Sequence, residues 1–350
     1  MILRRVSRPV SVGDMVIGGS YPVSIQSMTN TDTVDIKATI NQVDELSKAG
    51  AEFVRVAVPD EISVESLKEI IAQSRVPIIA DVHFRFEIAM AAMDCGIKKL
   101  RINPGNIGGL ENLVKISQKA QEKRIALRIG VNSGSIEKKI RERHGGATPE
   151  ALVESALNYV NALERVDFRD IVISLKASDV RTTYLSYKLM AEKTSYPFHI
   201  GVTEAGPLYR GSIKSAVGIG ALLLEGLGDT VRVSLSADPV KEIAAAKLIL
   251  QSAGVRTFGP ELISCPTCAR CGIDVLALAE EVEAIIKEVN KPLKIAVMGC
   301  AVNGPGEARD ADIGITGTKG YGLVFRGGKI LKRVAREDLI IVLKDELAKL

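Results

Sequence analysis

Residues Val23–Val58, VSIQSMTNTDTVDIKATINQVDELSKAGAEFVRVAV, contain a strand, a helix and a second strand in that order. Val23–Met28 and Phe53–Val58 are strand-length runs that contain Val, Ile or Phe, which are residue types enriched in strands. Between them, apolar residues recur every three or four positions, as on one face of a helix: Ile36, Ile40, Val43 and Leu46. Two strands separated by a helix form a crossover unit, so this stretch predicts two parallel strands in one sheet.

The same unit repeats along the chain. Eight strands are predicted in all: Val23–Met28, Phe53–Val58, Pro77–His83, Leu100–Asn103, Ala126–Asn132, Asp170–Lys176, His199–Thr203 and Thr230–Ser236. Eight such units over about 250 residues have the usual size of a closed (β/α)₈ barrel. We therefore predict an α/β chain in which residues 1–253 form a TIM-barrel substrate-binding domain. An open, doubly wound parallel sheet is the alternative, because pattern counting can gain or lose a strand.

The composition narrows the classes of function. Of the 350 residues, 4% are aromatic and none is Trp, and the formal net charge is +4. Proteins that bind nucleic acids use stacked aromatic side chains or many cations, so we expect no nucleic-acid partner. No apolar run approaches the roughly 18 residues that span a bilayer, and the first residues lack the apolar core of a signal peptide. We therefore expect a cytoplasmic protein without a membrane partner.

Charged side chains interrupt five of the predicted strands. They are Arg55, Arg101, Arg128, Lys176 and Arg232. TIM-barrel enzymes carry their sites at the carboxyl ends of the strands, and a charge that faces a packed core is costly to bury. Taken singly, each cation could be an exposed strand-end residue. Five of them at matching positions predict a shared cationic mouth for a polyanion, with arginine forks suited to phosphate oxygens.

Further polar residues follow the same strands. They are Asp81, His83, Asn132, Thr203, Glu204 and Ser234. Asp81 and His83 lie two residues apart and share one face of a strand, which favours a site over the alternative of a hydrogen-bonded core histidine. Glu204 could merely pair with a cation of the mouth. As the carboxylate nearest the cationic pocket, it is our candidate proton donor.

Four of the five cysteines lie in the last quarter of the chain. Cys265, Cys268 and Cys271 form a C-x₂-C-x₂-C run, and Cys300 follows in a distant loop. This spacing is typical of ferredoxin-type 4Fe-4S ligation, but four cysteines can also form a structural zinc site. The strand and helix patterns around them predict a small α+β domain over residues 254–350, which would carry the iron-sulfur cluster. The fifth cysteine, Cys95, is expected to pack at a helix end.

Four longer motifs stand out: LRINPGNIG at Leu100–Gly108, VTEAG at Val202–Gly206, CPTC at Cys265–Cys268 and GCAVNGPGEA at Gly299–Ala308. Together they closely resemble the 4-hydroxy-3-methylbut-2-enyl diphosphate synthases of the methylerythritol phosphate pathway. The similarity covers nearly the whole chain and fits the shorter, two-domain bacterial form. It implies an iron-sulfur oxidoreductase that opens the ring of 2-C-methyl-D-erythritol 2,4-cyclodiphosphate, takes up two electrons and releases a hydroxyl as water.

The resemblance also implies roles for individual residues. In the family, a 4Fe-4S cluster is held by three cysteines and one glutamate, which correspond here to Cys265, Cys268, Cys300 and Glu307. Glu307 would yield its iron to a substrate oxygen, because oxygen binds cluster iron less firmly than thiolate does. Cys271 departs from the family pattern and becomes a spare thiol. The five cations would bind the diphosphate, and Glu204 would protonate the leaving hydroxyl. The residues that would orient the carbon skeleton or the cluster face are Asp81, His83, Asn132, Thr203, Ser234 and Asn303.

Partners follow from the same resemblance. Family members are head-to-tail homodimers, in which the cluster domain of one subunit closes the barrel of the other, and they take electrons from flavodoxin or ferredoxin. We therefore expect a homodimer and one of these two donors. One other class of function stays open: a barrel that binds a phosphorylated pterin or sugar without redox chemistry and has a zinc-stiffened tail. A simple electron carrier is disfavoured, because it leaves the cationic barrel unexplained.

Overall fold

The computed structural model describes residues 3–300, 306 and 308–350. The chain divides into two compact units, Met1–Arg256 and Thr257–Leu350. In the part of the chain that is described, none of the helices combines the length and the apolar character needed to cross a membrane.

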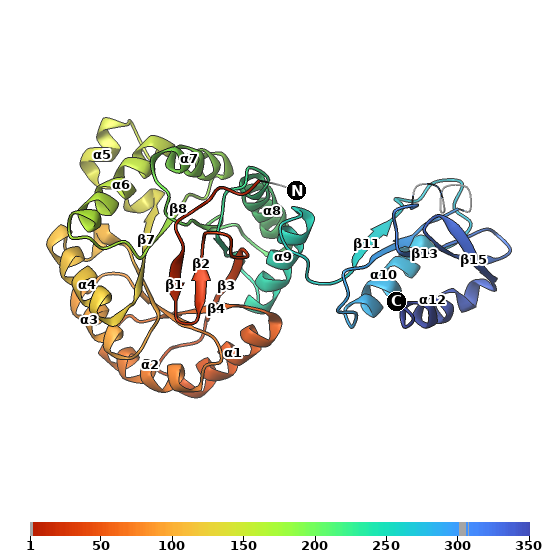
Figure 1. Ribbon diagram of the computed structural model, residues 1–350, viewed down its shortest axis with the longest axis horizontal. Coiled ribbons are helices and arrows are strands. Elements are labelled where there is room, and N and C mark those ends of the chain that lie inside the picture. Colours follow the sequence, from red (N-terminus) through yellow and green to blue (C-terminus); the bar gives the residue numbers. More distant parts are fainter. Residues whose placement is uncertain (1–2, 301–305, 307) are drawn as a thin grey trace. The chain divides into compact units, whose positions relative to one another are not determined.

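The first unit is a barrel of eight parallel strands (Figure 1). The strands are β3 (Ser24–Met28), β4 (Phe53–Ala57), β5 (Ile78–Val82), β6 (Lys99–Ile102), β7 (Ala126–Asn132), β8 (Ile171–Lys176), β9 (His199–Ile200) and β10 (Thr230–Val231). Each of β3 to β7 pairs with the next strand along the chain, and β10 pairs with both β9 and β3. A bridge between Ile173 and Phe198 joins β8 to the start of β9 and closes the ring. The predicted barrel is confirmed, and the doubly wound alternative is wrong because its strand order would reverse.

Helices surround this sheet (Figure 1). They are α1 (Ile36–Ala49), α2 (Glu61–Gln73), α3 (Phe86–Asp94), α4 (Leu110–Lys123), α5 (Lys138–Arg143), α6 (Pro149–Arg165), α7 (Val180–Lys193), α8 (Leu208–Leu224) and α9 (Pro239–Ser252). Side chains before several of them accept hydrogen bonds from the first helical turn, as Asp35 does from Ala38 and Asp60 from Ser63. Such caps satisfy backbone donors that have no partner inside the helix. In α1, the buried residues Val43 and Leu46 belong to the apolar face predicted from the sequence.

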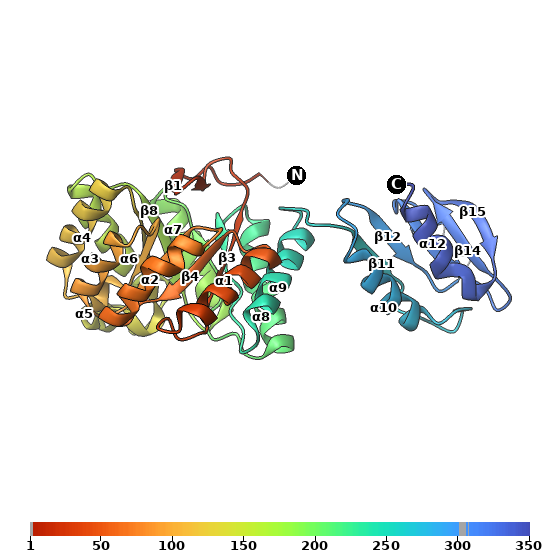
Figure 2. The same cartoon turned by 90° about the horizontal axis from the view of Figure 1, so that it is seen from below.

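A short hairpin closes one end of the barrel (Figure 2). It consists of β1 (Val10–Val12) and β2 (Met15–Ile17). Its apolar side chains are buried in one cluster with residues at the starts of barrel strands, among them Phe53 and Ala126. The amino-terminal end of the barrel is therefore an apolar floor, which leaves the opposite end for polar chemistry.

The second unit is a mixed sheet covered on one face by two helices (Figure 1). Its strands are β11 (Glu261–Ser264), β12 (Lys294–Val297), β13 (Ile313–Gly317), β14 (Gly322–Arg326) and β15 (Lys329–Val334), in that spatial order. The first three are parallel and the last three are antiparallel. Helices α10 (Val275–Ile286) and α12 (Leu339–Leu347) share a core with the sheet, including Val282, Leu343 and Ile315. The predicted small α+β fold is confirmed.

Candidate active site

Five cations gather toward the carboxyl ends of the barrel strands. Arg55 lies in β4, Arg101 in β6, Arg128 in β7 and Lys176 at the end of β8, while Arg232 directly follows β10. Their charges act on one another. Burial, and then the four arginines, lower the pKa of Lys176 well below its usual range. The structure thus brings together all five cations that the sequence singled out.

Asp81 is a buried carboxylate between these cations. Its Oδ1 accepts a 2.9 Å hydrogen bond from Arg101 Nη1, and its Oδ2 lies 3.4 Å from Arg55 Nε. His83 Nε2 lies 3.5 Å from Asp81 Oδ1 and contacts Arg101 Nη1. Burial by itself would raise the pKa of Asp81, but its cationic neighbours, Arg55 first, hold it well below the usual range. Asp81 is therefore ionised and fixes two guanidinium groups in place.

The mouth of the barrel nevertheless carries an excess of positive charge. A second carboxylate, Glu242 of α9, lies 3.5 Å from Arg232 and so offsets part of it. Arg128 is only 2% exposed, yet its Nε and Nη1 have no hydrogen-bond partner among the described residues. Burial and neighbouring cations also lower the pKa of Arg128. Buried donors without a partner are costly, so an anion bound here would relieve both the missing hydrogen bonds and the repulsion.

Two uncharged residues let the cations converge. Arg55 Nε and Nη2 lie 3.0 and 2.8 Å from Met28 Sδ, and Arg232 Nη1 lies 3.5 Å from the same sulfur. A thioether is a weak acceptor, so both guanidinium groups keep their capacity to bind ligand oxygens. At Gly201, a Cβ would lie 3.0 Å from Lys176 Nζ and would overlap the carbonyl oxygen of Arg232. Glycine is therefore what allows the backbone of Arg232 to approach the chain that follows β9.

The uncharged residues predicted for the site lie at the same end of the barrel. Asn132 ends β7, Thr203 follows β9 and Ser234 follows β10, and all three are half-buried. Asn132 forms a reciprocal cap with Ser135, whose Oγ accepts a 3.0 Å hydrogen bond from the Asn132 backbone N–H. This cap orients the chain where it leaves β7.

Glu204 is exposed on the turn that follows β9. Its backbone is left-handed, with φ of 52°, a conformation that costs a non-glycine residue on the order of 1 kcal/mol and is concentrated at functional sites. The described ion pairs of the mouth use Asp81 and Glu242, and Glu204 takes part in none of them. The alternative interpretation of Glu204 as a partner of a mouth cation is therefore not realised.

The cysteines of the second unit line a cavity of about 190 Å³. Cys265 follows β11, Cys268 and Cys271 lie in the next loop, and Cys300 lies beyond the end of β12. A Cβ at Gly299 would overlap Cys271 Sγ and would lie 3.2 Å from Cys265 Sγ, so the thiols approach the backbone where only glycine fits. The backbone N–H of Arg270 lowers the pKa of the Cys268 thiol, which favours the thiolate that binds metals.

The thiols of this cavity are potential donors for a metal ion or a cluster. In the described residues, no three His, Cys, Asp or Glu side chains converge on a single-ion site. A tetrahedral zinc needs four ligands within about 2.3 Å of one ion, whereas each thiolate of a 4Fe-4S site binds a different iron. Cys265 and Cys271 both lie close to Gly299, and the four thiols of the cavity offer donors for either kind of metal group. Two residues predicted for this site, Asn303 and Glu307, lie outside the described residues.

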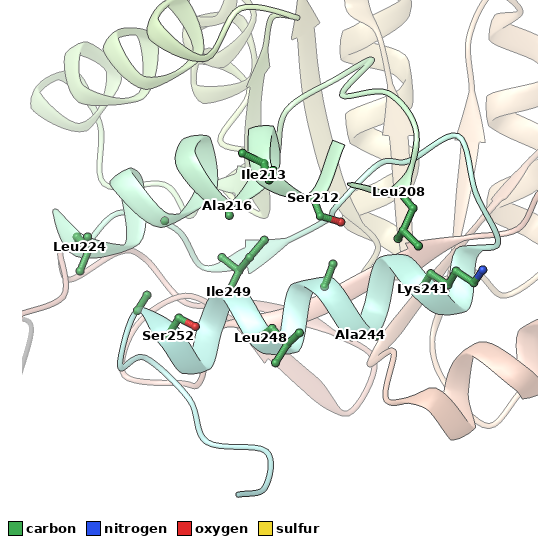
Figure 3. A pocket seen from close by; sticks show the side chains of 13 residues that line it. Leu208, Ser212, Ile213, Ala216, Leu224, Lys241, Ala244, Leu248, Ile249 and Ser252 are labelled. Carbon is green, nitrogen blue, oxygen red and sulfur yellow. The ribbon is translucent and has the colours of Figure 1, made fainter. Parts of the chain in front are cut away.

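A larger cavity of about 720 Å³ lies elsewhere in the barrel unit, between α8 and α9 (Figure 3). The side chains that face it include Leu208, Ile213, Leu248 and Ile249, and Lys241 contributes a cation at one end. A mainly apolar lining offers few partners for phosphate oxygens. This cavity is therefore not the predicted anion site.

Two protein-family models match the chain. The GcpE TIM-barrel domain matches residues 7–247, and the GcpE protein C-terminal domain matches residues 261–349. The chain belongs to the GcpE family. The family resemblance inferred from the four motifs is thereby confirmed.

Relatives of this GcpE chain include proteins of closely similar length. It is 52% identical over 337 residues to the 4-hydroxy-3-methylbut-2-en-1-yl diphosphate synthase (flavodoxin) of Clostridium perfringens, covering 96% of this chain and 97% of the relative. It is 50% identical over 350 residues to the protein of the same name from Geobacillus kaustophilus, covering 100% and 94%. Among solved structures, an N-acetylneuraminic acid synthetase from Leptospira borgpetersenii is similar with a TM-score of 0.51 and 12% identity, covering 79% and 96%. That likeness shows the barrel fold alone.

Three polar residues inside the GcpE barrel were missed by the sequence analysis. Lys99 begins β6 and is fully buried, but the strand predicted here began one residue later. His199 begins β9 and is also fully buried, and nothing in its neighbours distinguished it from a core histidine. Glu242 lies in the first turn of α9, where an acidic residue normally complements the helix dipole. A cation directly before an apolar strand was the one usable signal, at Lys99.

Proposed function

We propose that this chain catalyses the reductive ring opening of 2-C-methyl-D-erythritol 2,4-cyclodiphosphate to 4-hydroxy-3-methylbut-2-enyl diphosphate, a step that forms isoprenoid precursors. Membership of the GcpE family and relatives at 52% and 50% identity, named as synthases of this product, support the reaction. The structural observation that carries the proposal is the excess of buried positive charge at the barrel mouth. A cyclic diphosphate is a compact dianion that matches this excess.

The five mouth cations bind the two phosphate groups. Arg128 supplies two donors that lack partners among the described residues, and Arg55 and Arg232 supply guanidinium groups held over the sulfur of Met28. Arginine can contact two phosphate oxygens at once. Asp81 keeps Arg55 and Arg101 aimed into the mouth, because a carboxylate between two guanidinium groups fixes both. His83, Asn132, Thr203 and Ser234 then orient the carbon skeleton.

We propose that Cys265, Cys268, Cys300 and Glu307 hold a 4Fe-4S cluster, with Asn303 close to its face. When bound, this cluster supplies electrons and an iron that acts as a Lewis acid. The donor chemistry of the cavity supports the assignment, since four thiols line it. Cys271 lines the same cavity and is the competing fourth ligand.

The proton for the leaving hydroxyl comes from the carboxyl group of Glu204. Its position on the exposed turn after β9 supports this role, because it is free of the ion pairs that hold Asp81 and Glu242. The overall change consumes two electrons, breaks a ring C–O bond and releases the hydroxyl oxygen as water. The oxygen of the broken bond stays on phosphorus, so the product carries a terminal phosphate.

We further propose flavodoxin as the electron donor, which the names of the relatives support over ferredoxin.

The active form is a head-to-tail homodimer in which each cluster domain serves the barrel of the other subunit. Full activity of monomers in dilute solution would contradict the dimer. We place the reaction in the cytoplasm, as expected from the sequence.

Anaerobically purified protein tests the function. It should be brown, contain about four irons per chain and absorb broadly near roughly 400 nm, and it should convert the cyclic diphosphate when reduced flavodoxin is supplied. A Glu204→Gln variant should keep the iron and bind substrate, but should lose about 100-fold or more in turnover. Colourless, zinc-containing protein without turnover would contradict the proposal and would favour the non-redox phosphate-binding alternative.

A further inference from the structure

A layer of buried polar side chains lies beneath the cationic mouth. Lys99 is 0% exposed and lies two residues before Arg101 on the same face of β6. Its Nζ has no hydrogen-bond partner among the described residues. Polar side-chain atoms on β3, β9 and β10 likewise have no hydrogen-bond partner among the described residues, and they belong to Ser24, Gln26, His199 and Thr230. A lysine amine is very rarely buried in this way without a paired charge.

The charged groups around Lys99 are mainly cations. Across the barrel, its Nζ lies 4.9 Å from the centre of the Phe53 ring on β4. Arg128 of β7 and Arg55 of β4 act on its charge, and His199 of β9 interacts with it in turn. On β5, Ile79 pairs with Lys99 in the sheet. Two residues further along β5, the Asp81 carboxylate forms ion pairs with Arg101 and Arg55.

This environment decides the charge of the amine. Burial, followed by repulsion from Arg128 and Arg55, lowers the pKa of Lys99 well below its usual range. The imidazole of His199 experiences the same surroundings, and its pKa is lowered as well. Burial and the neighbouring cations therefore disfavour the charged form of both groups.

We propose that Lys99 binds a proton when phosphate groups bind to the arginines above it, so that substrate binding is linked to proton uptake. This inference rests on the proposed function, which supplies a dianion to the mouth. Negative charge beside Arg128 and Arg55 offsets the repulsion that disfavours a charged amine. By linkage, the protonated amine strengthens binding of the anion by the same factor.

The linkage also fits the product. Ring opening breaks the ester link of one of the two anhydride-linked phosphates and leaves a terminal phosphate, which can carry a further negative charge near neutral pH. A charged Lys99 beneath the arginines complements that extra charge.

Calorimetry on the oxidised holoenzyme tests the proposal. The cyclic diphosphate is titrated into the protein without an electron donor, at roughly pH 7–9, in buffers of different ionisation enthalpy. Both phosphates of this ligand have a fixed charge in that range, so protons taken up belong to the protein. Wild type should take up as much as about one proton per site, and Lys99→Met should lose that uptake. Lys98→Met, which changes the exposed neighbouring lysine, should match wild type.

Lys99→Arg provides a second variant should Lys99→Met not fold. A guanidinium stays protonated, so this variant should also bind the ligand without proton uptake. Binding by wild type without proton uptake, or unchanged uptake in both Lys99 variants, would overturn the proposal. Uptake that is lost only in His199→Gln would likewise overturn it and would assign the proton to the imidazole. Failure of the cyclic diphosphate to bind at all would count against the proposed function instead.

Discussion

The barrel mouth and the cysteine cavity are built in different ways. Arg55, Arg101 and Arg128 project from paired strands, so the register of the sheet determines their spacing. Cys265 and Cys268, in contrast, lie in a loop that contains the left-handed residue Thr267. A site carried by strands is in place before its ligand binds, whereas metal sites in loops commonly gain stability from the metal they hold. The two regions should therefore respond differently to mutation.

The largest effect is expected at the cysteine cavity. Cys300→Ser removes a proposed cluster ligand, and activity should fall by more than about 100-fold, since even changes around metal ligands cost up to that much. Iron content and visible absorbance should fall with it. Binding of the cyclic diphosphate to the barrel should persist, and this can be measured by calorimetry. Loss of substrate binding together with the iron would remove the distinction between the two regions.

The next largest effect is expected at the centre of the mouth. Arg128→Met removes charged hydrogen bonds to the diphosphate and should weaken substrate binding on the order of 100-fold. The ligand-free protein should be as stable as wild type or more so, because the variant removes a buried cation of which two donors lack hydrogen-bond partners among the described residues. Binding isotherms and thermal unfolding of the same samples test both statements. Unchanged affinity would mean that Arg128 does not contact the ligand.

A smaller effect is expected from removal of the Asp81 carboxylate. Asp81→Asn removes the negative charge that offsets the positive charges of Arg55 and Arg101. It should lower the free energy of unfolding by about 2 kcal/mol near neutral pH. Because folding lowers the pKa of Asp81, its contribution is present above the unfolded pKa of about 3.9 and is lost as pH falls through the folded value. The difference between wild type and variant should therefore shrink below about pH 4 in denaturant titrations. A constant difference down to pH 2 would contradict this account.

The smallest effect is expected at the spare thiol. Cys271→Ser should change cluster content and turnover little, by less than about twofold, if Glu307 is the fourth ligand. Glu307→Ala is the matched comparison and should leave a labile cluster held by three thiolates, with little turnover. The reverse pattern would make Cys271 the ligand and would weaken the role of an exchangeable iron site.

Strand and helix periodicity was sufficient to predict the barrel, but short or exposed elements escaped it. Strands β9 and β10 end at Ile200 and Val231, whereas the predicted strands continued into the polar residues that follow. The hairpin strands β1 and β2 have only three residues each, which is too few for alternation to be recognised. Strand β15 is a largely exposed edge strand. It therefore lacks the buried apolar face whose alternation with a polar face would identify it as a strand.

The sequence by itself determined the eight-unit barrel, the five cations at its mouth and the cysteine run, because each leaves a local pattern of spacing and residue type. Only the tertiary structure revealed that Asp81 holds two of the arginines and that Glu242 reaches the mouth from α9. It alone placed Lys99 and His199 in one buried layer. The physical reason is that a closed sheet brings together side chains from strands far apart in the sequence. The burial of these side chains and the electrostatic interactions among them then determine what they bind. Neither property can be predicted from a local sequence pattern.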